Sequence, residues 1–167
     1  MKALKLWVTV VLILALSMII TAPREAKAGK SLGLTKKQFI VSCNNLLSKF
    51  DLRFIVDDET KIINGAAYKL SSGSATLFVE GSNTLSKVAL ITMNVQGRPD
   101  REFLDVMGSV VISVLSQSVA DFNKFLSQWK DNTAQGLKEF TIQVKDKVFE
   151  VQINQAGVVG LTIKPAQ

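Results

Sequence analysis

Seven short runs of strand-like sequence constrain the fold of this chain most strongly. Four of them follow one another between Leu52 and Val95, and three more lie between Phe140 and Ile163. The connections between neighbouring runs are short and rich in Ser, Asn, Asp and Gly, which is typical of antiparallel neighbours. The runs are Leu52 to Val56, Lys61 to Leu70, Ala75 to Glu80, Val88 to Val95, Phe140 to Val144, Phe149 to Ile153 and Val159 to Ile163.

Helical periodicity precedes and separates the two groups of strands. Apolar residues recur at helical spacing from Phe39 to Phe50, and Thr35 with Gln38 has the spacing of a capping box at the start of that helix. Two further helices are expected, from Asp100 to about Gln117 and from about Asp121 to Asn132. The order α-β-β-β-β-α-α-β-β-β therefore predicts an α+β fold, with helices packed on one face of a mostly antiparallel sheet.

Two glycine-containing segments are compatible with more than one local structure. Asn64-Gly65, inside the second strand-like run, is either a hairpin turn or a bulge. Gly157-Val158-Val159-Gly160 lacks both the third glycine and the strand-turn-helix context of a dinucleotide site. We interpret that second segment as a hairpin turn.

Residues 1–28 have the parts of a cleavable secretory signal peptide. Lys2 and Lys5 precede an uncharged, mostly apolar stretch from Leu6 to Ile20, and Ala26-Lys27-Ala28 has the small-x-small pattern of a peptidase site. We expect cleavage after Ala28 and an extracytoplasmic protein, either periplasmic or secreted. The alternative is an uncleaved N-terminal anchor, because the apolar stretch reaches Ala22 and a spanning helix needs about 20 residues.

The remainder of the chain is long enough for one domain. We expect a short polar leader over residues 29–33 and a single α+β domain over residues 34–167. The net charge of the full chain is +6, but several of its basic residues lie in the signal segment. The other charges are of both signs and scattered, which argues against binding of nucleic acid.

The complete absence of histidine excludes the commonest catalytic and metal sites. Ser-His-Asp and Cys-His arrangements cannot be assembled, and a single cysteine cannot form the usual zinc site. Ser127 and Lys130 have S-x-x-K spacing, but the S-D-N and K-T-G elements that accompany it in β-lactamases do not occur. We therefore identify no catalytic residue, no metal ligand and no cofactor.

Two polar or reactive features have simple structural explanations. Asp57-Asp58-Glu59 lacks the alternating spacing of a calcium-binding loop, so we expect a solvated turn. Cys43 lies on the apolar face of the first expected helix, where a free thiol packs as a small hydrophobe. The alternative for Cys43 is a reactive or dimer-forming thiol.

The stretch from Val106 to Ala120 contains no charged residue, so most of its surface should be covered. One side forms a candidate interaction face of small residues, namely Ser109, Ser113, Ser116 and Ala120. A candidate apolar pocket consists of Phe103, Met107, Val110 and Trp129. The cover is either another helix of the same domain, a partner protein or second subunit, or an apolar ligand between helices and sheet.

Three functions remain open from these features. The leading hypothesis is an exported bacterial protein without enzymatic activity that binds another protein of the cell envelope or associates with itself. A carrier of a lipid or other apolar small molecule is the second, and it requires a cavity near Phe103 and Trp129. An atypical hydrolase without histidine is the third, and it requires a cleft with a strongly displaced pKa.

Overall fold

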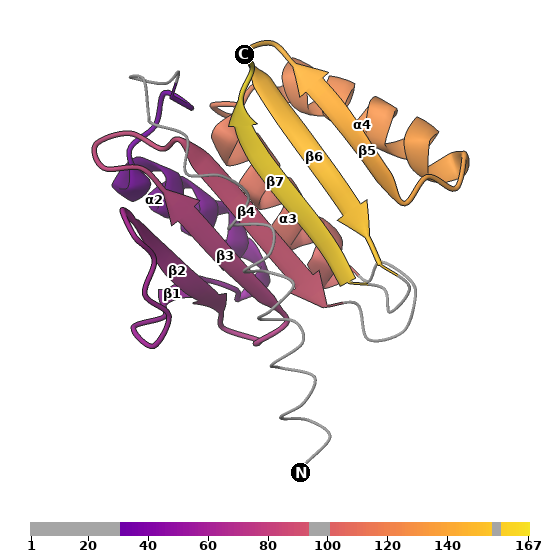
Figure 1. The fold of residues 1–167 in the computed structure, drawn as a ribbon. Helices are drawn as coiled ribbons and strands as arrows, with labels where there is room; N and C mark the ends of the chain where they lie inside the picture. The colour runs from indigo at the N-terminus through magenta and orange to yellow at the C-terminus, as the bar shows by residue number, and fades with distance from the viewer. Residues whose placement is uncertain (1–30, 94–100, 155–157) are drawn as a thin grey trace.

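A computed structural model of the chain describes residues 31–93, 101–154 and 158–167 (Figure 1). Within these residues it has an α+β fold with the expected order of helices and strands. The elements are α2 (Lys36–Leu47), the 3-10 turn η1 (Ser48–Phe50), β1 (Phe54–Val56), β2 (Gly65–Leu70), β3 (Ala75–Glu80), β4 (Lys87–Met93), α3 (Arg101–Val114), α4 (Val119–Ala134), β5 (Glu139–Val144), β6 (Lys147–Ile153) and β7 (Val158–Pro165).

The strands form one antiparallel sheet in the order β1-β2-β3-β4-β7-β6-β5. Two meanders, β1 to β4 and β5 to β7, meet where β4 pairs with β7, for example at Leu90 and Leu161. The three helices lie together behind this sheet in Figure 1, so they cover a single face. The predicted architecture is therefore confirmed.

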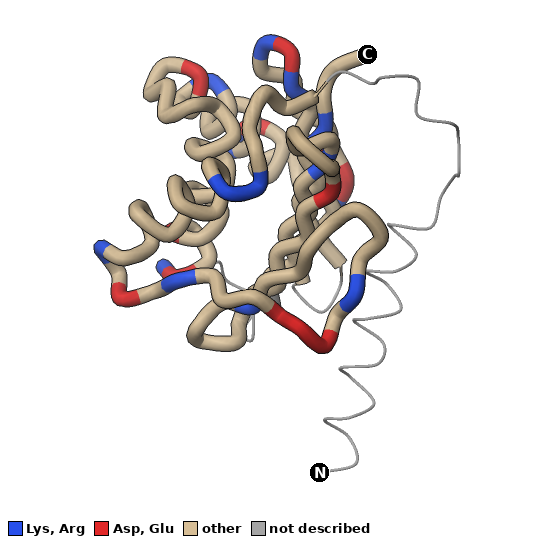
Figure 2. Tube along the Cα trace, turned by 90° about the vertical axis from the view of Figure 1, so that its left-hand side faces the viewer, with Lys and Arg blue, Asp and Glu red and all other residues tan. Residues whose placement is uncertain are grey.

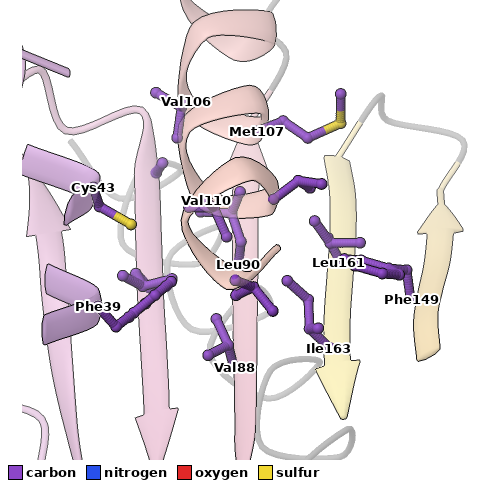
Figure 3. Packing of buried hydrophobic residues seen from close by; sticks show 14 of the residues in the cluster. Phe39, Cys43, Val88, Leu90, Val106, Met107, Val110, Phe149, Leu161 and Ile163 are labelled. Carbon is purple, nitrogen blue, oxygen red and sulfur yellow. The ribbon is translucent and has the colours of Figure 1, made fainter. Parts of the chain in front are cut away.

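The core fills the space between the helices and the sheet (Figure 3). Phe39 and Cys43 of α2 and Met107 of α3 point into it, opposite Leu90 of β4 and Leu161 of β7. All five side chains are at most 2% exposed. Alternation along each strand sends these apolar residues to the helix side, as expected from the period of two.

The N-terminal part of the described chain differs from the expected leader. The leader was predicted to end at residue 33, outside the domain, but Leu32 is only 2% exposed and belongs to the core. Its backbone N–H donates to the carbonyl of Leu85 at 2.7 Å, and the N–H of Leu85 donates to Leu34 at 2.7 Å. Residues before the first helix are thus tied to the β3–β4 connection.

Two turn predictions also need correction or completion. β2 begins at Gly65 rather than Lys61, because Asn64 takes a left-handed φ of 56° and the Gly65 N–H closes a turn onto Ile62. Asn64-Gly65 therefore ends the β1–β2 connection and is not a bulge. Val158 to Gly160 form the start of β7 rather than a hairpin turn, whereas Gly157 lies outside the described residues.

The helix ends follow local capping. Thr35 and Gln38 form the predicted capping box, with the Gln38 N–H 3.2 Å from the Thr35 hydroxyl. α3 ends at Val114, three residues earlier than expected, because Ser116 and Gln117 both have positive φ and reverse the chain. Ser118 then caps α4 and starts it earlier than expected.

Candidate functional site

The four residues of the predicted small-residue face do not form one surface. Ser109 and Ser113 are 5% and 2% exposed, and the Ser42 hydroxyl of α2 donates to the Ser113 hydroxyl at 2.9 Å. α2 therefore covers this side of α3 within the domain. Cover by another helix of the same domain was one of the three alternatives given for the uncharged stretch. Ser116 and Ala120 are exposed, but they lie after the end of α3, one in the connection and one in α4.

The four residues of the predicted apolar pocket lie near one another and pack tightly. Phe103, Met107 and Val110 are buried in the core, and Trp129 of α4 is half-buried against it. The Trp129 ring lies 6.4 Å from Phe103 and 5.4 Å from Phe140, measured between ring centroids. Aromatic rings at these distances are in direct packing contact, so they occupy the space that a carried ligand would need.

Cys43 lies fully inside the core between α2 and α3. Its side chain is 0% exposed, and its thiol is 3.8 Å from the carbonyl oxygen of Ser109. Burial raises the pKa of this thiol to about 12, while the Ser113 hydroxyl lowers it to a smaller extent. The thiolate, which is the reactive form, is therefore strongly disfavoured, and core packing of Cys43 is confirmed.

The carboxylate of Asp57 stabilises the acidic turn in which Asp57 lies. Its carboxylate accepts hydrogen bonds from the Thr60 hydroxyl at 2.7 Å and pairs with Lys69 at 3.1 Å. Burial alone would raise the pKa of the Asp57 carboxyl, but these partners outweigh burial and hold it below its ordinary value. Asp58 and Glu59 are exposed as expected. Asp57 is only 7% exposed, because its carboxylate points inward to the partners that hold the turn together.

The remaining chemical candidates are not assembled into a site. Ser127 and Lys130 are both exposed on α4. In the described ranges, no group of three or more His, Cys, Asp or Glu residues is arranged to hold a metal ion. Basic and acidic residues alternate over the described chain rather than forming one stripe (Figure 2).

The most distinctive surface is the sheet face opposite α2, α3 and α4, which we call the helix-free face because none of these three described helices lies on it. Side chains that alternate with the core positions of β2, β3 and β4 point to it, and four of them form a second apolar cluster together with one residue of the β1–β2 connection. Phe78 of β3 and Ala67 of β2 are 6% and 1% exposed at its centre, with half-buried residues packed around them. Those surrounding residues are Ile62, Ala89 and Ile91.

Ion pairs join neighbouring strands on the helix-free face. Glu80 of β3 pairs with Lys87 of β4 at 3.2 Å, and Glu150 of β6 pairs with Lys164 of β7 at 2.5 Å. Lys69 of β2 pairs with Asp57 beside Ala67. The charges on this face therefore largely compensate one another, which leaves an apolar centre with a balanced polar surround.

The alternation pattern contained a signal for this face that our sequence reading passed over. In β3, Leu77 and Val79 point to the core, yet Phe78 between them is also a large apolar residue. A strand with one solvated face should be polar at that position. An apolar residue in both phases of a strand indicates that both faces make contacts.

The edge strand β1 has a feature that sequence reasoning could not find. Asn44 of α2 accepts a hydrogen bond from the Phe54 N–H at 2.7 Å and donates to the Phe54 carbonyl at 3.1 Å. The side-chain amide thus takes the place of a neighbouring strand at Phe54. This contact blocks the outer edge of β1 against strand addition, a common protection of sheet edges.

Comparison with known proteins adds no assignment to this geometry. The chain matches no protein-family model, no curated protein and no solved structure. None of the helices in the described part of the chain has the length and apolar character needed to span a membrane.

Proposed function

We propose that this chain is an exported bacterial protein without enzymatic activity that binds another protein through its helix-free face. The N-terminal signal pattern supports export, with cleavage after Ala28. The missing histidine supports a role outside the common hydrolase mechanisms. The observation that carries the binding proposal is the apolar cluster in which Ile62, Ala89 and Ile91, all partly exposed, surround the buried Phe78 on a sheet face that none of the described helices covers.

The helix-free face has the composition of a protein-binding surface. Protein interfaces combine an apolar centre with a polar rim whose charges are satisfied. Here the partly exposed Ile62, Ala89 and Ile91 supply the centre around the buried Phe78, and the Glu80–Lys87 and Glu150–Lys164 pairs lie at its border. Adjacent strands of one sheet form this surface, and such an extended surface suits a folded partner better than a small ligand, which needs a concave site.

The two other functions have less support. A carrier of apolar molecules requires space near Phe103 and Trp129, where the aromatic rings pack against one another instead. A hydrolase requires a reactive group with access to substrate. The strongly displaced pKa of Cys43 belongs to a buried core thiol and favours its unreactive form.

Photo-crosslinking in the host tests the binding surface directly. A photoreactive amino acid at Thr162 would lie on the helix-free face of β7, next to Ala89 of β4 in the sheet register. The expected result is one crosslinked product of discrete mass from this position. Because Asn123 is exposed on α4, on the other side of the sheet, the same substitution there is the matched control and should give no such product.

A second variant makes the crosslinking result specific. Ala89→Arg would place a long charged side chain into the centre of the helix-free face, where the apolar cluster now lies. It should abolish the product from Thr162, and because Ala89 is half-buried, circular dichroism of the purified variant must show that the domain still folds. Equal products from Thr162 and Asn123, or none from Thr162, would refute this role of the face.

A further inference from the structure

The two edge strands of the sheet, β1 and β5, differ in whether other described residues bind their outward backbone groups. At one edge, Asn44 already occupies the outward backbone groups of Phe54 in β1. At the other edge lies β5, whose single partner among the described strands is β6. The contrast matters because an unprotected edge strand is a template for adding another strand.

The outer backbone groups of β5 can be assigned from its pairing with β6. The Ile153 N–H donates to the Lys138 carbonyl at 2.7 Å, so Lys138 and every second residue after it direct their backbone groups to β6. Glu139, Thr141 and Gln143 then direct theirs outward. Among the described residues, no backbone hydrogen bond from outside β6 reaches these three.

We propose that β5 is a dimerisation edge, at which a second copy of this chain adds its own β5 in antiparallel orientation about a two-fold axis at Thr141. This register places Glu139 of each copy opposite Gln143 of the other, and the two Thr141 residues face each other. Carboxylate–amide and Thr–Thr neighbours are favourable cross-strand pairs. No like charges meet along the strand.

Helix α4 supplies an independent sign of self-complementarity. Asp121, Lys124, Gln128 and Asp131 share one flank of α4 by their helical spacing. Asp121 pairs with Lys145 at 2.5 Å just beyond β5, whereas Trp129 contacts Phe103 of α3. The flank with Lys124 and Asp131 therefore borders the outer edge of β5.

The same two-fold axis brings opposite charges of the two α4 helices together. Two contacts, Asp121–Lys145 and Trp129–Phe140, show that α4 and β5 run antiparallel to each other. Thr141 lies between the two contacts along β5, and the corresponding position along α4 is near Gln128. An axis near Gln128 places Lys124 of one copy opposite Asp131 of the other, twice in the dimer. Both side chains are exposed, and among the described residues Lys124 acts electrostatically on Asp121 of its own helix without forming a salt bridge to it.

The oligomeric state of the chain, isolated from cells that express the full sequence, tests this proposal. Sedimentation and light scattering should show a dimer at micromolar concentration. Lys124→Glu should weaken the dimer by roughly tenfold, because it sets two like-charge contacts in the interface. Lys130→Glu, at an exposed position away from that flank of α4, is the matched control and should leave the dissociation constant unchanged.

A charge exchange separates the proposed contact from general effects of charge. Lys124→Glu combined with Asp131→Lys should restore the dimer to within about threefold of the original, since each pair is re-formed with reversed signs. Thr141→Pro, which removes an outward N–H, should give a folded monomer. A monomer at all concentrations, or a dimer insensitive to both Lys124→Glu and Thr141→Pro, would overturn the proposal.

This dimer goes beyond the proposed function and uses a different part of the molecule. The β5 edge and the α4 flank lie at one side of the sheet, whereas the apolar cluster around Phe78 lies on β2, β3 and β4. Loss of the dimer in Lys124→Glu with crosslinking from Thr162 retained would show that the two surfaces act independently. Failure of the dimer proposal therefore leaves the partner-binding proposal standing.

Discussion

Cys43 is expected to resist thiol reagents in the folded protein and to react at the rate of a free thiol once the domain is unfolded. The thiol is 0% exposed, and its pKa is raised to about 12. Reaction therefore requires opening of the domain, which at a typical stability slows labelling by at least about a thousandfold. Labelling followed by intact-mass measurement, with and without denaturant, gives this ratio.

The raised pKa of Cys43 also predicts the direction of a pH effect. A neutral thiol is favoured in the folded state, so this contribution to stability is fully present below the ordinary pKa of 9.0 and is lost as pH rises toward 12. Cys43→Ala should remove that alkaline dependence while lowering stability at neutral pH by up to a few kcal/mol. Rapid labelling of the folded chain would contradict the buried position.

Phe149→Ala should cause the largest loss of stability among single core substitutions, about 3 to 5 kcal/mol. Phe149 of β6 is 0% exposed, and its ring lies 5.0 Å from Phe125 of α4. Removal of the ring leaves a cavity between α4 and the sheet that neighbouring side chains cannot fill. Chemical denaturation monitored by the fluorescence of Trp129 measures the effect next to the site.

A surface phenylalanine provides the control for this substitution. Phe50 follows the first helix and is 40% exposed, so Phe50→Ala should change the free energy of unfolding by no more than about 0.5 kcal/mol. Similar losses for the two variants would mean that α4 does not pack on β6 through Phe149. The outer helix would then be less firmly attached than the structure indicates.

Local sequence signals were sufficient to predict most elements but not their partners. Side-chain periodicity and the spacing of Thr35 and Gln38 specify a strand or a capped helix from a few neighbouring residues. The pairing of β4 with β7 joins residues about seventy positions apart, such as Leu90 and Leu161. Periodicity shows which faces are apolar, but it does not show which strands are neighbours.

Backbone conformation caused most of the errors at element ends. Ser116 and Gln117 continue the uncharged stretch, so composition alone extended α3 through them, yet both have left-handed φ. That reversal is why Ala120 lies on a different helix from Ser113. Non-glycine residues with positive φ are uncommon, and only surrounding packing selects them.

The candidate surfaces depend on spatial arrangement and were hardest to predict. Asn44 and Phe54 are ten residues apart, and their two hydrogen bonds exist only because α2 runs beside β1. The uncharged helix was recognised correctly as needing cover. Which element supplied it, α2 through Ser42, could be decided only from the three-dimensional structure.

Native mass spectrometry of the chain taken from the exported fraction of its host tests the proposed function most directly. We expect a chain that begins at Gly29, bound in a complex whose mass, beyond that of a second copy of this chain, includes another protein. Release of that protein by Ala89→Arg would link it to the helix-free face. A chain that retains Met1, or one that carries only the mass of a small apolar molecule, would contradict the account.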